Sequence, residues 1–385
     1  MVIQTHVQKC IQELLAYVES TDYAGYDPYD AMNSPLLRRA TAGSKWMRMA
    51  VTQFLRRLPV NIRPLLGVRR GYNPKGIGLC LWGYTRLYAL DRNPEYLGPI
   101  HRLRGLLEDL KSKGYSGSCW GYNFDWQSRT LRAPAFTPTV VNSSFIGHAL
   151  LDAYAVLGIQ SDLDTAVSIK DFLLNDVKRL EDDSTFCFTY SPVDDYGVHN
   201  ANLLGASLLA RLAHITGDST LNDPALAALS YSMKCQKPDG SWYYSERPGF
   251  NWIDSFHTGF NLQAIRYFLD VGLAQEHRDS YRRGVEFYAK SFFLEDGTPK
   301  YYHDRTYPVD IHSPAQAICF FADEEDVYSE LTDRVLQWML DHLYSGKGFF
   351  YFRKGRFLTN RIPYMRWSQA WAFHALTEYL FARSK

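Results

Sequence analysis

The 385-residue sequence lacks several features that would assign it to a common class of protein. Its 42 Lys and Arg residues are balanced by 41 Asp and Glu residues, so it shows no excess of positive charge of the kind that nucleic-acid-binding proteins carry. No apolar run reaches the roughly 20 residues of a membrane-spanning helix. The N-terminus has no basic region followed by an apolar stretch and a cleavage site. We therefore expect no nucleic-acid partner, no transmembrane segment and a cytoplasmic location.

Signatures of metals and cofactors are also missing. The six cysteines lie far apart, at positions 10, 80, 119, 187, 235 and 319, with no Cys-x-x-Cys pair. This spacing favours reduced thiols over a disulfide framework or a zinc site. No Gly-rich loop ends in Lys-Ser or Lys-Thr, as a phosphate-binding loop does. We expect neither a metal nor a cofactor, and nothing in the sequence indicates an oligomeric state.

The chain contains an internal repeat of a buried helix. Five segments begin with a polar or aromatic residue and continue as an apolar helix rich in small residues. They start at Asn142, Asn200, His257, His312 and Trp367, with spacings of 58, 57, 55 and 55 residues. A degenerate copy starts at Lys75, 67 residues before Asn142. Because a helix that is apolar nearly all round must be buried, the repeat predicts six inner helices.

Amphipathic helices are expected between the inner ones, over residues 97–113, 162–180, 219–235, 278–293 and 326–343. A sixth comes from 1–19 or from 44–57. Six inner and six outer helices predict an all-α fold, an (α/α)6 toroid of six helical hairpins, with an open helical solenoid as the alternative. We expect residues 71–385 to form the toroid domain, and residues 1–70 to add helices to the same domain. Segment 23–35 either covers the mouth as a lid or ties the first helix to the barrel.

Aromatic residues are in excess, at 15% of the chain, and many fall in the long connections that lead into the inner helices. Alternating aromatic runs at 186–190, 241–245 and 348–353 predict short β-ribbons at the rim. Rim loops held by a rigid scaffold commonly carry function. We predict substrate binding by polar and aromatic residues at this rim: Asn142, Asn200, Trp126, Trp242, Trp252 and Trp367.

The loop over residues 347–366 holds six cations and no acidic residue. Guanidinium groups bind carboxylate, sulfate or phosphate through two parallel hydrogen bonds. We therefore predict that Arg353, Arg361 and Arg366 bind an acidic glycan.

The arrangement of six hairpins with aromatic loops resembles the (α/α)-toroid carbohydrate-active enzymes. These include six-hairpin glycosidases, polysaccharide lyases, the C-terminal domain of glucuronyl C5-epimerases and toroid proteins of polysaccharide biosynthesis. The segments most similar to the epimerase domain are Asn142-Ser-Ser-Phe-Ile-Gly-His-Ala-Leu-Leu-Asp-Ala-Tyr-Ala and Phe256-His-Thr-Gly-Phe-Asn-Leu-Gln-Ala-Ile. Separately, Gln236-Lys-Pro-Asp-Gly-Ser-Trp242 resembles a repeat of the triterpene cyclases. The first resemblance implies chemistry on a sugar, and the second leaves an isoprenoid enzyme as an alternative.

Two mechanisms fit the rim residues. Removal of the proton next to a uronate carboxylate, as in a lyase or C5-epimerase, needs a base and an acid. For these roles we predict His199, His257, His312, Tyr244 and Tyr302. Glycoside hydrolysis needs two carboxyl groups instead, for which Asp125 and Asp254 are the candidates. We expect proton abstraction from an acidic, uronate-containing glycan. The alternatives are a glycoside hydrolase and a non-catalytic glycan-binding toroid of polysaccharide biosynthesis.

Overall fold

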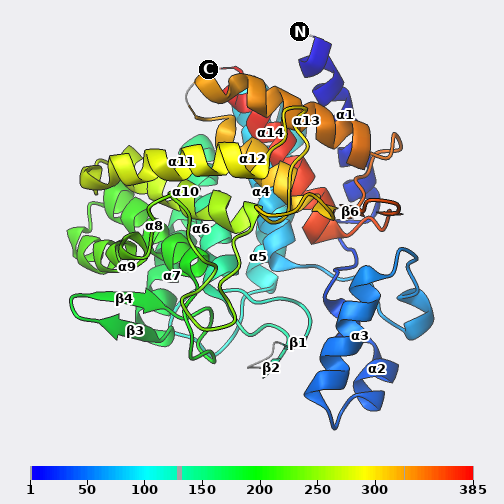
Figure 1. Ribbon diagram of the computed structural model, residues 1–385, viewed down its shortest axis with the longest axis horizontal. Coiled ribbons are helices and arrows are strands. Elements are labelled where there is room, and N and C mark those ends of the chain that lie inside the picture. The colour runs from blue at the N-terminus through cyan, green and yellow to red at the C-terminus, as the bar shows by residue number, and fades with distance from the viewer. Residues whose placement is uncertain (1, 128–131, 325, 385) are drawn as a thin grey trace. The chain divides into compact units, whose positions relative to one another are not determined.

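The computed structural model describes residues 2–127, 132–324 and 326–384. The described chain is mainly helical, with fourteen α-helices and seven strands of two to four residues (Figure 1). The helices are α1 (Val2–Ser20), α2 (Pro35–Ala40), α3 (Lys45–Arg57), α4 (Pro74–Asp91), α5 (Leu97–Asp109), α6 (Val140–Leu157), α7 (Gln160–Asp171), α8 (His199–Thr216), α9 (Asn222–Lys234), α10 (Ser255–Asp270), α11 (Arg278–Phe292), α12 (His312–Phe321), α13 (Ser329–Leu343) and α14 (Trp371–Ala382). The strands are β1 (Trp126–Gln127), β2 (Arg132–Ala133), β3 (Arg179–Asp182), β4 (Thr185–Phe188), β5 (Val309–Asp310), β6 (Arg353–Lys354) and β7 (Thr359–Asn360).

The helices belong to two compact units. Unit 1 comprises Met1–Lys111, Trp120–Thr137 and Tyr307–Lys385, and unit 2 comprises Ser112–Cys119 and Pro138–Thr306. In unit 2 the inner helices α6, α8 and α10 pack in that order, and α7, α9 and α11 each pack on one of them. In unit 1 the inner helix α14 packs on α4 and α12, while α5, α13 and α1 pack outside. The contact of α1 with α14 makes α1, and not α3, the sixth outer helix.

The inner helices are buried, as their all-round apolar sequences predict. In α6 every residue from Val140 to Ala153 is buried. This helix is also long and apolar enough to cross a membrane, but 78% of its apolar window is buried inside the structure, as in the core helix of a globular domain. The outer helix α11, by contrast, buries only one face.

One hydrogen bond is repeated at the start of five inner helices. In each case a backbone N–H of the first helical residue or of the residue before it donates to a carbonyl in a rim segment far along the chain. Such N–H groups have no partner inside the helix, so the rim segment satisfies them. The bonds are Val140 to Tyr190, His199 to Tyr244 and Ser255 to Tyr301 in unit 2, and Ile311 to Phe352 and Met365 to Tyr26 in unit 1, at 2.9 to 3.2 Å.

The last of these bonds joins the two ends of the chain. Met365 begins η8 (Met365–Ala370), the helical segment that leads into α14. Its N–H donates to Tyr26, which lies just after α1. The N-terminal segment thus supplies the rim carbonyl that the next repeat would otherwise supply, and it ties the first helix to the final inner helix.

The predicted rim ribbons are only partly present. The run at 186–190 is confirmed, because β4 pairs antiparallel with β3, whereas the run at 348–353 is a strand only from Arg353. The run at 241–245 is irregular, and the prediction of a ribbon there is wrong. The indole of Trp242 turns inward to donate to Ser232 at 2.9 Å, and the Tyr244 N–H donates to Trp252 at 2.8 Å. These bonds fix the segment in an irregular conformation, with no strand assigned over 241–245.

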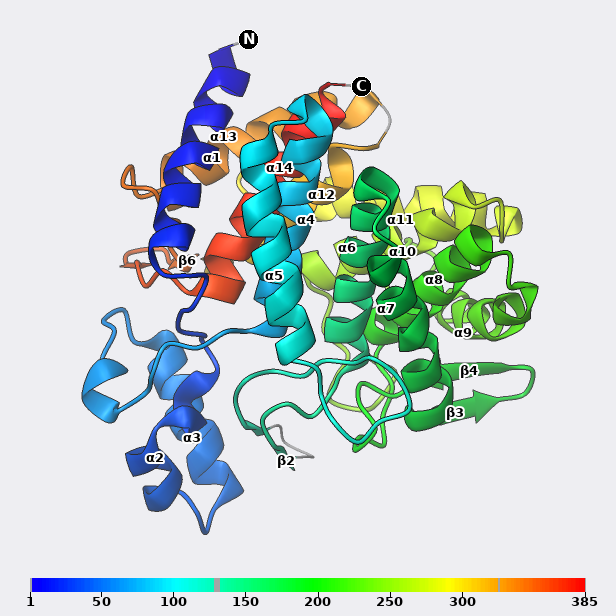
Figure 2. The same cartoon turned by 180° about the vertical axis from the view of Figure 1, so that it is seen from behind.

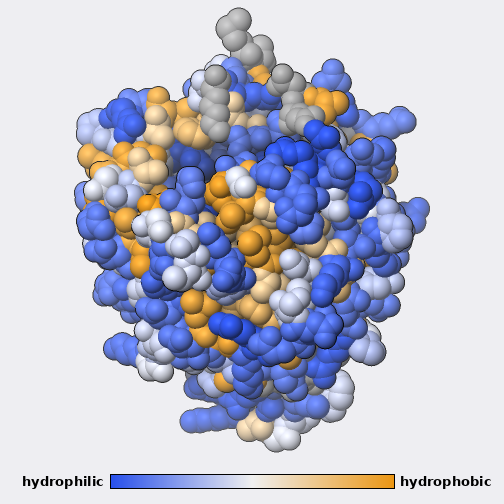
Figure 3. All heavy atoms as spheres, turned by 90° about the vertical axis from the view of Figure 1, so that its left-hand side faces the viewer, coloured by the Kyte–Doolittle hydropathy of each residue, from blue (hydrophilic) through white to orange (hydrophobic). Residues whose placement is uncertain are grey.

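Within unit 1, α2 and α3 lie together, apart from α4 and α14 (Figures 1 and 2). The face drawn in Figure 3 mixes hydrophilic residues with a central group of apolar ones.

All six cysteines are free thiols, and only Cys235 is not fully buried.

Candidate functional site

The predicted site residues form separate groups in the two units, and in each unit they lie at the starts of inner helices. In unit 2, Asn142, Asn200 and His257 are the third, second and third residues of their helices. In unit 1, His312 begins α12 and Trp367 is the third residue of η8. The repeat therefore predicted the helix starts correctly.

In unit 2, Asp254 and His257 form a hydrogen-bonded pair at the start of α10. Asp254 is the N-cap: its Oδ1 accepts from the His257 backbone N–H at 3.1 Å, while its Oδ2 lies 2.7 Å from His257 Nδ1. An ionised carboxylate only accepts, so Nδ1 donates this hydrogen bond, and in the neutral imidazole Nε2 is then the acceptor. Trp252 donates to the same Oδ2 at 3.1 Å. The buried carboxylate therefore orients an imidazole whose side chain is still 23% exposed.

Aromatic rings surround this imidazole. Tyr244 and Trp252 are stacked, with ring centroids 4.6 Å apart and planes 13° apart, and Tyr244 lies 4.7 Å from the His257 ring. Both rings are half-buried. Tyr302 belongs to the same rim, because its backbone pairs with that of Asp254. The structure thus brings together five residues that the sequence singled out. The rings of His257, Tyr244 and Trp252 are partly exposed, and the carboxylate of Asp254 is buried beneath them.

His199, the second predicted base of unit 2, has another role. It is buried, with Nδ1 3.0 Å from Ser232 Oγ and Nε2 3.1 Å from Glu246 Oε1. The hydrogen bond from His199 lowers the pKa of the Glu246 carboxyl. Because both ring nitrogens are engaged, His199 links α8 to α9 and to the rim, and this geometry does not support it as the base.

The same histidine belongs to a group with possible metal ligands. His199, Cys235 and Glu246 place a nitrogen, a sulfur and an oxygen within 4.8 Å of one another, the one such group among the residues that the structure describes. These are donor types that zinc accepts. However, burial raises the pKa of the Cys235 thiol to about 11, and His199 is already held by Ser232 and Glu246. The group is a hydrogen-bonded link between elements, and we assign no metal to it.

Three predicted binding residues of unit 2 are buried. Trp242 is 2% exposed and its indole is bonded inside the unit, so the prediction that it stacks on a sugar is corrected: it is a core residue. Asn142 and Asn200 are also buried. Neither polar atom of the Asn142 amide has a hydrogen-bond partner among the described residues.

In unit 1, a buried carboxylate gathers predicted residues from three elements. Asp310 accepts from the Trp367 indole at 2.6 Å, from Arg353 at 3.0 Å and from the His312 backbone N–H at 3.2 Å. The buried His312 ring lies 4.8 Å from the ring of Trp367 and 4.4 Å from that of Trp371. His312 is thus enclosed by two indole rings. Its imidazole is buried, whereas that of His257 is partly exposed.

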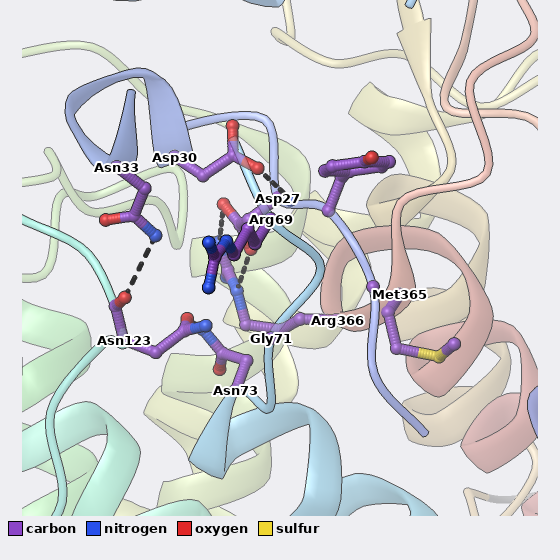
Figure 4. A pocket seen from close by; sticks show the side chains of 11 residues that line it. Asp27, Asp30, Asn33, Arg69, Gly71, Asn73, Asn123, Met365 and Arg366 are labelled. Atoms are coloured by element: carbon purple, nitrogen blue, oxygen red, sulfur yellow. Dashed lines mark hydrogen bonds and ion pairs between the residues drawn. The ribbon is translucent and has the colours of Figure 1, made fainter. Parts of the chain in front are cut away.

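A second buried carboxylate of unit 1 lies beside a small polar cavity. Asp27 binds Arg366 through two hydrogen bonds, at 2.6 and 2.9 Å, and both side chains are buried. The cavity has a volume of about 10 Å³, roughly that of one water molecule. Figure 4 shows that Asn33, Asn73 and Asn123 converge there, and Asn123 accepts from both of the others at 3.1 and 2.9 Å. Segment 23–35 is therefore tied to η8. This agrees with the expectation that the segment ties the first helix to the barrel.

These contacts correct the interpretation of the charged loop. The loop itself holds no acidic residue, but Arg353 and Arg366 are neutralised by Asp310 and Asp27 and are not free to bind an acidic glycan as predicted. Both acids lie outside the loop and could not be seen in its local sequence. Arg361 is exposed, and its role in binding an anion stays a prediction.

The carboxyl groups of the hydrolytic alternative are engaged separately. Asp125 of unit 1 accepts from Arg132 at 2.7 Å and from the Ala135 backbone at 3.0 Å. It adjoins the half-buried Trp126 in β1. Asp254 belongs to unit 2 and is bonded to His257. Neither unit therefore contains both members of the predicted pair.

Lys75 is a functional candidate that sequence reasoning did not select. It is the second residue of α4 and starts the degenerate copy of the repeat, as Asn142 and His312 start theirs. It is 2% exposed, and its Nζ lies 5.2 Å from the centroid of the Trp371 ring. Burial, reinforced by the charge of Arg366, lowers its pKa well below the usual range. Its place at the start of the degenerate repeat could have indicated this candidate from the sequence.

No protein-family model matches the sequence, and no curated protein matches it either. Solved structures do share its fold. Cellobiose 2-epimerase from Bacillus thermoamylovorans has 13% identity and a TM-score of 0.65, over 82% of this chain and 90% of that one. A GH76 α-mannanase from Bacteroides thetaiotaomicron has 14% identity and a TM-score of 0.63, over 83% and 89%. A polysaccharide lyase has 11% identity and a TM-score of 0.55, over 81% and 90%. The chain therefore has the (α/α)6 toroid fold of these carbohydrate-active enzymes.

Proposed function

We propose that the protein is a carbohydrate-processing enzyme that removes a proton from a sugar carbon next to a carbonyl or carboxylate group. The observation that carries the proposal is the Asp254–His257 pair. Its carboxylate fixes the imidazole through Nδ1, so that Nε2 is the acceptor on a partly exposed ring. That is the arrangement a general base needs. The fold supports a sugar substrate, because the similar structures include an epimerase and a lyase.

In this proposal His257 Nε2 takes the proton from carbon, and the electron pair moves onto the neighbouring carbonyl or carboxylate oxygen. Return of a proton to the opposite face inverts the carbon, as in an epimerase. Loss of the oxygen substituent one carbon further on gives an unsaturated sugar, as in a lyase. Tyr244, whose ring lies 4.7 Å from that of His257, is the candidate acid, and Trp252 with Tyr244 offers the stacking surface.

The substrate class is proposed as an acidic, uronate-containing glycan, as the resemblance of the sequence to uronate-processing toroid enzymes implies. Arg361 of unit 1 is exposed and stays a separate prediction for binding an anion. Arg353 and Arg366, the other predicted anion-binding residues, are neutralised within unit 1 by Asp310 and Asp27. A neutral reducing sugar, whose own carbonyl accepts the electron pair, is therefore included in the test.

The test is incubation in deuterated water with two sets of oligosaccharides, one uronate-containing and one neutral and reducing. NMR follows deuterium incorporation at carbon, absorbance follows unsaturated products, and a reducing-end assay follows hydrolysis. We expect deuterium incorporation or unsaturation. Substituting His257→Gln should lower either rate by about 10²-fold or more, the usual contribution of a general base.

The matched control is His277→Gln. His277 has the same side-chain exposure, 23%, but lies at the end of η6 (Gln275–His277), outside the rim. It should leave the rates unchanged. Asp254→Asn keeps an oxygen for the N-cap but removes the carboxylate, so it should lower the rate without unfolding the protein. New reducing ends without deuterium incorporation or unsaturation would contradict the proposal and favour hydrolysis.

A further inference from the structure

One segment of unit 1 is strongly basic. Residues 31–70 contain nine Lys and Arg residues and no Asp or Glu. The rest of the chain holds 33 Lys and Arg residues against 41 Asp and Glu residues, a formal net charge of −8. The near-neutral total therefore hides a local excess of positive charge.

The same segment exposes large apolar side chains. Six of the fourteen exposed large hydrophobic residues in the described chain belong to it: Leu36, Trp46, Met47, Phe54, Val60 and Leu65. Two of them, Trp46 and Phe54, form an apolar stripe on α3 together with the exposed Ala50, because the three residues are spaced four apart and lie on one helix face. Trp46 is 63% and Phe54 60% exposed. Single exposed apolar residues are ordinary, but a cluster of this kind marks an interaction surface.

Internal contacts hold this surface in place. On the opposite face of α3, Leu55 is buried against Ala31 and Met32 in a small core of its own. Arg63 is buried and bonded to Asp30 at 2.6 Å, and Arg48 donates to Gln127 at 2.9 Å. The outward stripe is thus presented by a fixed helix.

The same two helices carry exposed cations. Arg38 and Arg39 lie at the end of α2, while Lys45 and Arg57 lie at the two ends of α3, and all four are exposed. The surface formed by α2 and α3 therefore combines aromatic and aliphatic side chains with positive charge and has no acidic residue. We call it the α2–α3 surface.

We propose that the α2–α3 surface binds the surface of an anionic lipid bilayer, as a peripheral contact without a membrane-spanning segment. Charge complementarity selects this partner: anionic headgroups attract the cations, and the apolar stripe enters the boundary between headgroups and acyl chains. Tryptophan at the centre of the stripe suits that boundary, where its amphipathic ring is favoured. A nucleic acid would satisfy the cations but would leave the apolar stripe in water.

The test is flotation of the full-length protein with vesicles of phosphatidylcholine, with or without phosphatidylserine. We expect binding only to vesicles that contain phosphatidylserine, and weaker binding as salt rises. Arg38→Gln with Arg39→Gln should lower the partition coefficient about 30-fold, since each cation near an anionic surface contributes about fivefold. Trp46→Ser with Phe54→Ser should lower it about tenfold or more.

Matched controls come from unit 2. Ile215→Ser with Leu294→Ser removes two other exposed apolar residues, and Arg278→Gln with Lys290→Gln removes two exposed cations. Both double variants should bind as the wild type does, and circular dichroism should show all variants folded. Equal loss in the controls would overturn the proposal, as would wild-type protein that ignores the anionic vesicles. A dimer lost in the Trp46 and Phe54 variant, without vesicle binding by the wild type, would reassign the surface to self-association.

Discussion

The buried pair of Asp27 and Arg366 gives the most quantitative prediction about stability. The two side chains are 5% and 3% exposed and share two short hydrogen bonds. Removing one partner leaves an uncompensated charge in a buried position, which costs about 3–5 kcal/mol. We therefore expect Asp27→Asn and Arg366→Met each to lower the free energy of unfolding by that amount. Asp27→Asn is conservative, because the amide oxygen can still accept from the Tyr29 backbone N–H, as Asp27 does at 3.1 Å.

The double variant separates the pair from its surroundings. Once both charges are gone no charge is left unpaired, so we expect the double variant to lose less stability than the sum of the two single variants, by at least about 1 kcal/mol. The assay is urea unfolding followed by tryptophan fluorescence and by circular dichroism. Coincident transitions are required before a free energy is assigned to a chain with two compact units.

The result bears directly on the N-terminal segment. If each single variant costs less than about 1 kcal/mol, or if the two losses simply add, the pair does not hold the segment against η8. Segment 23–35 would then have to be reconsidered as a lid that moves over the mouth.

Two further predictions concern single positions. Lys75 has a lowered pKa, so between that pKa and its ordinary value near 10.4 the unfolded chain binds the extra proton and stability rises with pH, by up to about 1.4 kcal/mol per pH unit. Lys75→Met should remove this slope in urea titrations between neutral and alkaline pH, and an unchanged slope would refute a buried neutral lysine. Gly117→Ala would place its Cβ 2.0 Å from the Ser168 carbonyl oxygen and should cost about 2 kcal/mol or more. Gly105→Ala on α5, with nothing within 4 Å, should stabilise by about 0.5–1 kcal/mol, so similar melting temperatures for the two variants would contradict the described packing.

The helical scaffold was predictable because its signal is local and repeated. A helix that is apolar nearly all round must be buried, and such a helix recurs about every 55 residues in this sequence. The helix starts near Asn142, Asn200 and His257 follow from that repeat. The rim segments were less predictable. A run of aromatic residues at 241–245 has the pattern of a strand. In the structure, however, the indole of Trp242 donates to Ser232 and lies in the core of unit 2.

The charges of the site were the least predictable feature, because their partners are distant in the sequence. Arg353 is 43 residues from Asp310, and Arg366 is 339 residues from Asp27. Local composition could not reveal either pair. The sequence offered Asp254 as a carboxyl group for hydrolysis and His257 as a base for proton abstraction, in separate mechanisms. In the structure the two side chains form one pair, in which Oδ1 of Asp254 caps the helix and Oδ2 orients the imidazole.

The central claim is that His257 removes a proton from carbon, and chemical rescue tests it most directly. The measurement is the initial rate of deuterium incorporation into the substrate by the His257→Ala variant, with and without added imidazole. The account predicts a rate at least about 10²-fold below that of the wild type, and a rise in proportion to the concentration of free imidazole base, because the exposed cavity left by the side chain admits the missing base. A His257→Ala variant that exchanges deuterium at the wild-type rate without imidazole would contradict it.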